Sequence, residues 1–186
     1  MTTKTTWVID PGHSTIQFKV KHLAIANVTG TFRSFNGYAD TEGESFEGAK
    51  VYFEMDTASV DTNNTERDNH LKSGLFLDIV QFPKITFSGT LSKAGDGYLL
   101  QGGLTIRGTT KTISLEAEHT GIGAGRFNDT RAGFEVTGKI NRKDFGLDIN
   151  LVGGAGNLVV GEDIKFQIDA ELIKQKYGLP GGSIRG

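Results

Sequence analysis

The amino-acid sequence predicts an all-β protein, an elongated eight-stranded antiparallel up-and-down barrel with one short helix. Hydrophobic and polar residues alternate over most of the chain, which is the period of a strand with one buried face. Glycine is abundant, at 26 of 186 residues, whereas proline occurs only 3 times. This combination is typical of strands that are joined by tight turns and bent by bulges.

Alternating runs of apolar residues mark the individual strands in chain order. The runs are Ile16, Phe18 and Val20; Val51, Phe53 and Met55; Ile85, Phe87 and Leu91; Leu104 and Ile106; Ile113, Leu115 and Ala117; Phe134, Val136 and Ile140; and Ile164, Phe166, Ile168, Ala170 and Leu172. Turn signals lie between them, at Asn36-Gly37, Glu42-Gly43, Gly95-Asp96-Gly97 and Arg107-Gly108. Together these segments provide about eight strands at hairpin spacing, which is the arrangement of a meander.

One polar segment, residues 63–74, breaks the alternation and predicts the short helix. Asn63 is the expected N-cap, Glu66 follows three residues later as in a capping box, and Gly74 ends the helix. A meander with one apolar face can close into a barrel, which removes its unpaired edges, and a two-sheet sandwich is the alternative. We expect residues 1–176 to form a single domain and residues 177–186, which lack periodicity, to form a flexible tail.

The bulk composition excludes several classes of function. With 20 basic and 22 acidic residues the net charge is -2, which gives no electrostatic reason to expect nucleic acid as a partner. No apolar stretch reaches the roughly 18 residues of a membrane helix, so stable membrane insertion is not expected. The first residues do not resemble a signal peptide, which predicts a cytoplasmic protein; the alternative is a periplasmic or secreted protein whose leader has been removed.

Catalytic and metal-binding motifs are absent from the sequence. The chain has no cysteine, and its four histidines fit no metal-ligand spacing. It contains neither an HExxH motif nor a GxSxG elbow. We therefore expect no catalytic residues, no metal site, no cofactor and no enzymatic activity.

Several motifs, in a specific order, are similar to those of a known family. They are Trp7-Val8-Ile9-Asp10, His13-Ser14, Val60-Asp61-Thr62, Arg67-Asp68, Phe76-Leu77-Asp78, Phe82-Pro83, Leu104-Thr105-Ile106-Arg107-Gly108, Asn141-Arg142-Lys143-Asp144-Phe145-Gly146 and Val160-Gly161-Glu162-Asp163. Along nearly its whole length the chain resembles the YceI-like family of lipocalin-like, polyisoprenoid-binding barrels. The resemblance implies a long-chain isoprenoid lipid, such as a polyprenyl phosphate or a quinone, bound in the barrel pore. Family members can be dimeric, so a homodimer is also an expected assembly.

Strand phase identifies the residues that would line such a pore. The expected pore-lining residues are Phe18, Val20, Phe32, Phe53, Phe87, Leu104, Ile106, Phe134, Val136, Phe166 and Ile168. Glycines at the inward positions 30, 89 and 138 would leave room among these large side chains. Periodicity alone favours a filled core, and the family resemblance reverses this preference in favour of a cavity.

Four polar residues are candidates for binding the head group of the lipid. His22 shares the inward phase of its strand and could hydrogen-bond a carbonyl or phosphate oxygen, while His13 precedes that strand. Arg67 and Arg142 could bind phosphate through two parallel hydrogen bonds. Each has a structural alternative. His22 could be satisfied by a backbone carbonyl or by Asp144, and His13 could be a turn residue. Arg142 paired with Asp144, or Arg67 paired with Asp68, could tie the helix to the barrel rim.

Three classes of function follow from this reading of the sequence. A lipid carrier or storage protein predicts an apolar ligand that copurifies. A capture protein for diverse amphiphiles, including hydrophobic antibiotics, predicts broad competition among ligands. An enzyme that modifies an isoprenoid or quinone predicts turnover that is lost on His22→Ala, and the absence of a catalytic constellation disfavours it.

Overall fold

The fold is that of a computed structural model which describes residues 3–148 and 160–176. The tail expected at residues 177–186 lies outside the described residues. The described elements are β1 (Lys4–Ile9), β2 (Thr15–His22), β3 (Ala26–Phe32), β4 (Phe35–Glu42), β5 (Lys50–Asp56), β6 (Val60–Asp61), α1 (Thr65–Lys72), β7 (Lys84–Ala94), β8 (Gly97–Ile106), β9 (Thr109–Ala124), β10 (Thr130–Asn141) and β11 (Val160–Lys174).

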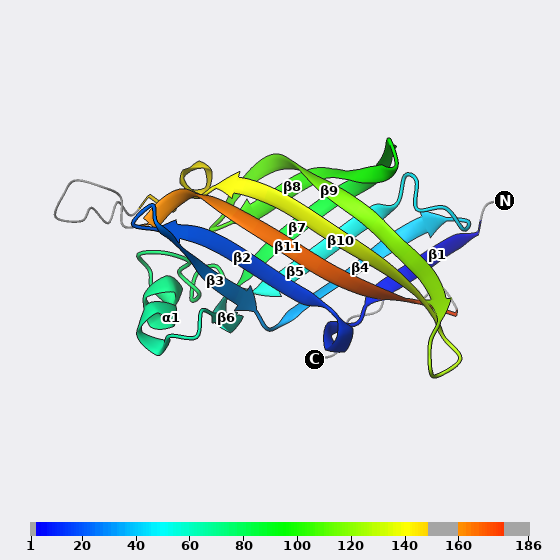
Figure 1. Cartoon of the computed structure of the whole chain (residues 1–186), viewed down its shortest axis with the longest axis horizontal. Coiled ribbons are helices and arrows are strands. Elements are labelled where there is room, and N and C mark those ends of the chain that lie inside the picture. Colours follow the sequence, from blue (N-terminus) through cyan, green and yellow to red (C-terminus); the bar gives the residue numbers. More distant parts are fainter. Residues whose placement is uncertain (1–2, 149–159, 177–186) are drawn as a thin grey trace.

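These strand segments form one closed antiparallel barrel with eight strand positions (Figure 1). The sheet runs β1-β4-β5-β7-β8-β9-β10-β11, and β11 pairs back with β1, which closes it. Three positions are each built from two consecutive segments: β1 with β2, β3 with β4, and β5 with β6. The predicted eight-stranded meander is therefore confirmed, and the sandwich is excluded because no free edge separates two sheets.

The long interior of the barrel is apolar because each strand turns alternate side chains inward. In β7, for example, Ile85, Phe87 and Leu91 are only 4 %, 6 % and 4 % exposed. The hairpin that follows β8 turns at Arg107 and Gly108, which both have positive φ, as a tight hairpin requires. Strand phase and turn chemistry thus agree with the arrangement that the sequence predicts.

Helix α1 lies at one end of the barrel, and its N-cap is Asn64 rather than the predicted Asn63. The Asn64 side chain accepts a hydrogen bond from the Arg67 amide at 2.9 Å, whereas Asn63 has a left-handed φ of 60° and belongs to the preceding turn. Two adjacent asparagines can both cap a helix, so the turn geometry decides between them. Asp68 anchors the helix to β6, because its carboxylate accepts from both the amide and the hydroxyl of Thr62, at 2.8 and 2.6 Å.

The turn expected at Asn36-Gly37 is also wrong, since both residues lie inside β4. A Cβ atom on Gly37 would lie 2.8 Å from the Phe53 ring and 2.9 Å from the Tyr52 carbonyl oxygen. Gly37 therefore allows the close approach of a neighbouring strand, which a local turn signal cannot reveal.

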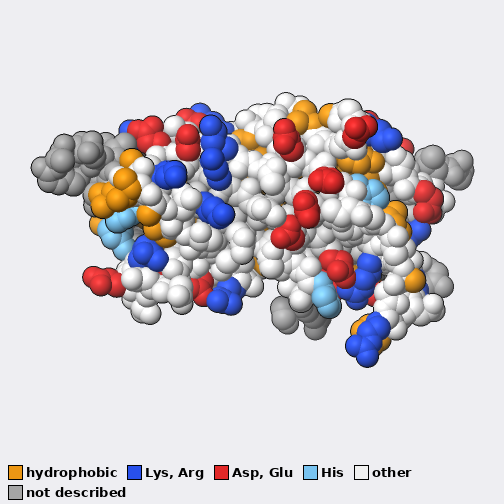
Figure 2. All heavy atoms as spheres, viewed as in Figure 1, with side chains coloured by type: hydrophobic (Ala, Val, Ile, Leu, Met, Phe, Trp, Pro, Cys, Tyr) orange, Lys and Arg blue, Asp and Glu red, His pale blue; other side chains and the backbone are white. Residues whose placement is uncertain are grey.

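The outer surface carries charges of both signs. On the face in Figure 2, acidic and basic side chains are interspersed along the barrel wall. Among the described helices, none combines the length and the hydropathy that a membrane-spanning helix needs.

Replacing Gly102 by alanine should destabilise the barrel by about 1–3 kcal/mol. Its Cβ would lie 2.1 Å from the Ser88 carbonyl oxygen and 2.4 Å from the Gly89 Cα, so β7 and β8 would have to separate. Urea unfolding of Gly102→Ala and Gly123→Ala tests this, because a Cβ on Gly123 in β9 has no atom within 4 Å. Equal stability of the two variants would contradict the close approach of the strands.

Candidate functional site: the barrel lumen

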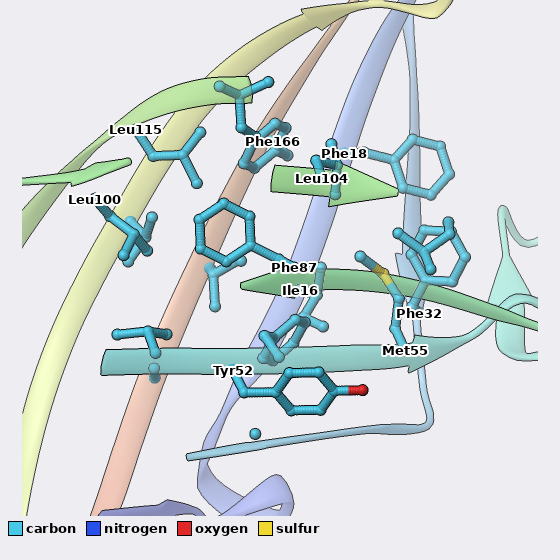
Figure 3. A pocket seen from close by; sticks show the side chains of 18 of the residues that line it. Ile16, Phe18, Phe32, Tyr52, Met55, Phe87, Leu100, Leu104, Leu115 and Phe166 are labelled. Carbon is cyan, nitrogen blue, oxygen red and sulfur yellow. The ribbon is translucent and has the colours of Figure 1, made fainter. Parts of the chain in front are cut away.

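The barrel encloses a cavity of 220 Å³, which we call the lumen. Its lining residues come from every strand position, and most of the labelled side chains point toward one shared space, whereas Tyr52 lies on the other side of β5 (Figure 3). Residues outside the strands contribute as well: Leu71 from α1, and Phe76 and Leu77 from the segment that follows it. Tyr38 and Tyr52 are the polar side chains among the lining residues, so the lumen offers almost no hydrogen-bonding groups.

All the predicted pore-lining residues except Val20 line the lumen. Those that do are Phe18, Phe32, Phe53, Phe87, Leu104, Ile106, Phe134, Val136, Phe166 and Ile168. Val20 lies further toward the α1 end and lines a second cavity. The inward faces therefore enclose a cavity and not a filled core.

Glycines in the barrel wall keep the lumen open by making room for aromatic rings. A Cβ on Gly30 would lie 2.2 Å from the Phe18 ring, and one on Gly89 would lie 2.7 Å from the Phe87 ring. Likewise, a Cβ on Gly138 would lie 2.7 Å from the Phe166 ring. Each ring thus lies against the wall in the space that a side chain would fill, and it projects less into the lumen.

The second cavity, of 420 Å³, lies at the α1 end and adjoins the lumen. Phe18, Leu71, Phe76 and Ile164 line both cavities and form the boundary between them. Unlike the lumen, the second cavity has charged and polar residues among those that line it, although the surface they present to it is mainly apolar; these residues include His22, Asn64, Glu66, Arg67, His70 and Arg142. Figure 2 shows hydrophobic and histidine side chains gathered at this end of the molecule.

Arg67 is held at this second cavity by Thr62. Its Nε donates to the Thr62 hydroxyl at 2.8 Å, and its Nη2 donates to the Thr62 carbonyl oxygen at 2.7 Å. The remaining nitrogen, Nη1, makes no hydrogen bond to any described residue. Arg67 thus ties α1 to the rim, as the structural alternative proposed, and still presents a charged donor beside His22 and His70.

Arg142 is only 1 % exposed, and its side chain hydrogen-bonds to the backbone. Its guanidinium donates to the carbonyl oxygens of Leu147 at 2.5 Å, Gly161 at 2.9 Å and Val160 at 3.3 Å. All three guanidinium nitrogens are therefore engaged, and the expected pairing with Asp144 is not formed. Arg142 fastens the end of β10 to the start of β11.

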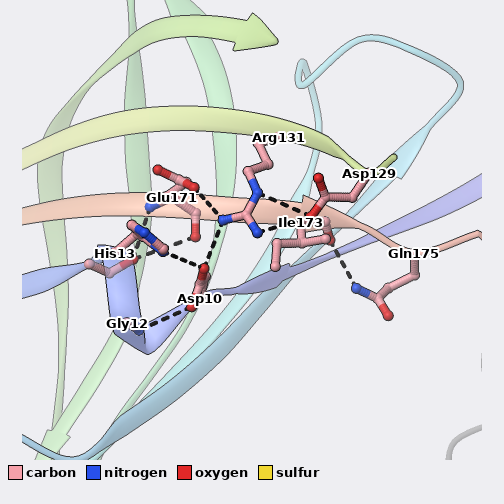
Figure 4. A network of polar contacts seen from close by, with 9 residues as sticks. Asp10, Gly12, His13, Asp129, Arg131, Glu171, Ile173 and Gln175 are labelled. Carbon is pink, nitrogen blue, oxygen red and sulfur yellow. Dashed lines mark hydrogen bonds and ion pairs between the residues drawn. The ribbon is translucent and has the colours of Figure 1, made fainter. Parts of the chain in front are cut away.

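His13 lies away from the other candidates, in a 3-10 turn between β1 and β2. Its Nδ1 lies 2.8 Å from the Asp10 carboxylate (Figure 4). Arg131 also contacts Asp10, at 2.8 Å, and bridges to Glu171 and Asp129 at 2.5 and 2.9 Å. We call these five residues the seam network, because they join the β1–β2 interruption to β10 and β11.

The seam network sets the ionisation of Asp10. Hydrogen bonds from His13 and then Arg131 lower the pKa of Asp10 below its usual value, against an opposing effect of burial. Ligand atoms of Asp10, His13 and Glu171 lie within 4.8 Å of one another, as a metal site would need. However, the Arg131 guanidinium already occupies both carboxylates and would repel a cation there. The geometry therefore fits an ion-pair network better than a metal site.

The sequence analysis missed several lumen residues that lie outside the alternating runs, among them three from loops or the helix. Leu71 belongs to the helix, Phe76 follows it, and Phe46 lies in the loop between β4 and β5. Period-two alternation cannot identify such residues, because they reach the lumen through loop and helix placement.

Comparison with known proteins reveals relatives over most of the chain. A profile of the YceI-like domain matches residues 7–172. Protein YceI of Salmonella newport (strain SL254) is 38% identical over 165 residues, which cover 88% of this chain and 83% of that protein.

Solved structures share the barrel. The Campylobacter jejuni YCEI protein is 32% identical, with a TM-score of 0.68, over 84% of this chain and 90% of its own. A polyisoprenoid binding domain from Saccharophagus degradans, implicated in plant cell wall breakdown, also has a TM-score of 0.68 over 94% of this chain and 100% of its own. At 13% identity, that second likeness concerns the fold alone.

The seam network should make folding stability depend on pH in the acid range. The pKa of Asp10 is lower when folded, so its contribution is complete above the ordinary value of 3.8 and is lost as the pH falls through the folded value. Asp10→Asn should cost about 1–2 kcal/mol at neutral pH, and its deficit should shrink toward acid pH.

Unfolding free energies of both proteins between neutral pH and pH values below 3.8 measure this effect. Glu118→Gln, which removes an exposed carboxylate from β9, is the matched control and should follow the wild type. A constant deficit of Asp10→Asn at every pH would refute the electrostatic origin.

Proposed function

Because the chain belongs to the YceI-like family, we propose that its barrel binds a long-chain isoprenoid lipid and carries or stores it without changing it chemically. The proposed ligand has its apolar chain in the lumen and its polar head in the second cavity. The shared barrel of the polyisoprenoid binding domain from Saccharophagus degradans supports an isoprenoid as the ligand class.

The observation that carries the proposal is the difference in lining residues between two adjoining cavities. The lumen is apolar along the barrel, whereas arginine and histidine side chains are among the residues that line the second cavity. A linear amphiphile with a long tail and a compact head matches both. A polar metabolite would lose its hydration in the lumen without gaining partners there.

Burial of the chain alone provides enough free energy for tight binding. Each buried methylene-sized group contributes about 0.8 kcal/mol, so about twenty buried carbons contribute roughly 16 kcal/mol before costs. Association costs are estimated at about 4–15 kcal/mol. The difference between the two free energies favours binding without any ion pair to the tail. This agrees with a lumen that has no charged lining residue.

For the head group we propose Arg67, His22 and His70 as contacts. The Nη1 group of Arg67 can donate to a phosphate or quinone oxygen while Thr62 holds the rest of the guanidinium. Arg142 is omitted because carbonyl oxygens occupy its donors, and His13 because it belongs to the seam network.

A second candidate function is the capture of diverse hydrophobic amphiphiles. The near absence of polar groups in the lumen favours it, because an apolar tube discriminates by length and width and not by hydrogen bonding. An enzyme acting on the lipid head is the least supported alternative. Among the described residues, the one serine or threonine hydroxyl that lines either cavity is that of Thr62, and it already donates to Asp68 and accepts from Arg67.

Denaturing extraction of the purified protein, followed by mass spectrometry of the organic phase, tests the proposed function. We expect an isoprenoid close to one molecule per chain, or stoichiometric uptake of added polyprenyl lipids. Capture of unrelated amphiphiles with equal affinity would favour the second candidate. An empty extract together with no uptake would refute both.

Arg67→Ala should weaken binding of a polyprenyl phosphate about tenfold and leave the polyprenol of equal chain length unaffected. The lost contact is a charge-assisted hydrogen bond, which the alcohol uses far less. Competition binding with the two lipids measures the difference. Arg126→Ala, at an exposed arginine of the hairpin between β9 and β10, is the matched control. Equal losses for both lipids would exclude Arg67 as a head-group contact.

A further inference from the structure

The end of the lumen opposite α1 is blocked by one side chain from a loop. Phe46 lies between β4 and β5, outside any strand, yet it is only 2 % exposed. The loop is fastened to β7: Gly48 donates its amide to the Leu91 carbonyl at 2.8 Å, and Leu91 donates its amide to the Ala49 carbonyl at 2.9 Å. A further bond joins the Lys93 amide to the Glu47 carboxylate. The position of Phe46 is therefore fixed by backbone contacts next to it.

The Phe46 ring reaches across the bore of the barrel. Its centroid lies 5.1 Å from that of Trp7 in β1, 5.3 Å from His119 in β9 and 4.9 Å from Phe134 in β10. In the closed strand order, β10 lies opposite β5, the strand at which the loop ends. Because its ring contacts Phe134 on the opposite strand β10, Phe46 spans the barrel from one side to the other.

The lining of the lumen ends at this ring. Phe46 and Phe134 both line the cavity, whereas their aromatic neighbours Trp7, Tyr98 and His119 do not. Three other aromatic rings of the lumen are placed differently. Phe18, Phe87 and Phe166 lie over wall glycines, as described above, and leave the bore open. Phe46 is the ring that closes it.

From this geometry we infer that Phe46 is the stop that sets the maximum chain length of the bound lipid. The inference rests on the proposed function and specifies which isoprenoids the lumen holds. A chain enters from the α1 end, and each further methylene-sized group that becomes buried raises affinity about fourfold. Once the chain end touches Phe46, additional carbons must remain in the second cavity or in water. Affinity then stops rising with chain length.

Phe46→Ala should move this length limit upward by roughly one isoprene unit, because the ring that leaves occupies about that volume. Phe87→Ala is the matched control: Phe87 is also a buried lumen phenylalanine, at 6 % exposure, but it lies on the wall in the middle of β7. Its removal widens the lumen without lengthening it, so the limit should stay where it is in the wild type.

The experiment presents a mixture of all-trans prenyl alcohols, from farnesol to decaprenol, in phospholipid vesicles to the full chain. The protein is separated from the vesicles by gel filtration, and the retained alcohols are extracted and quantified by mass spectrometry. We expect retention by the wild type to rise with length up to a limit, the same limit for Phe87→Ala, and a longer one for Phe46→Ala.

An unchanged limit in folded Phe46→Ala would overturn the assignment of Phe46 while leaving lipid binding intact. If circular dichroism shows that Phe46→Ala is unfolded, Phe46→Leu decides instead, because it retains more packing and still shortens the side chain. An unchanged limit in that variant would equally overturn the assignment. A wild-type protein that retains no prenyl alcohol would overturn the proposed function and, with it, the stop.

Discussion

The pairing of β11 with the first strand position closes the sheet, and the rest of the structure depends on this seam. β11 pairs with β1 through Trp7, Val8 and Ile9 and with β2 over a longer stretch. Without the seam, the inward faces would border an open sheet and could not surround a lumen. The closing strands come from opposite ends of the chain, so their contacts are the most distant in sequence and incur the largest loop-closure entropy.

Polar interactions are concentrated where the seam is interrupted. Between β1 and β2, the Ser14 hydroxyl accepts from the Glu171 amide at 2.9 Å, in place of a regular strand partner. The Asp10 amide donates to the Glu171 carbonyl at 2.8 Å, and Arg131 joins the two acidic side chains. At the α1 end, Arg142 satisfies backbone carbonyls near the start of β11. Charged groups therefore hold the wall together from outside the lumen, and the lumen stays apolar.

The shape of the lumen results from a balance between aromatic rings and glycines. Phenylalanines on the wall reduce the bore least where a glycine on a neighbouring position gives the ring space, as Gly30 does for Phe18. The same residue type has the opposite effect at position 46, because the β4–β5 loop directs that ring across the barrel. Placement, and not residue type, decides whether a phenylalanine forms wall or end.

Much of the fold could be predicted from the sequence, because strand alternation and hairpin turns are local properties. The phase of residues such as Phe87 and Leu104 identified their inward orientation, and Arg107-Gly108 identified a hairpin. Neighbouring asparagines are chemically equivalent as caps, so the choice of Asn64 over Asn63 depended on the geometry of the turn. The role of Gly37 could not be predicted from the sequence for the same reason: the ring that needs its missing side chain, Phe53, lies on another strand.

The sequence by itself determined the meander of strands, the inward-facing residues and the lack of any catalytic motif, because alternation, composition and motifs are local properties of the chain. Closure of the strands into a barrel instead of a sandwich was decided by the pairing of β11 with β1. Only the tertiary structure decided that the interior is a cavity, that the guanidinium of Arg142 donates its hydrogen bonds to backbone carbonyl oxygens, and that His13 lies apart from His22. It also decided that Phe46 ends the lumen. Each of these depends on the distance between segments far apart in the chain, which closure of the barrel establishes and a linear pattern does not contain.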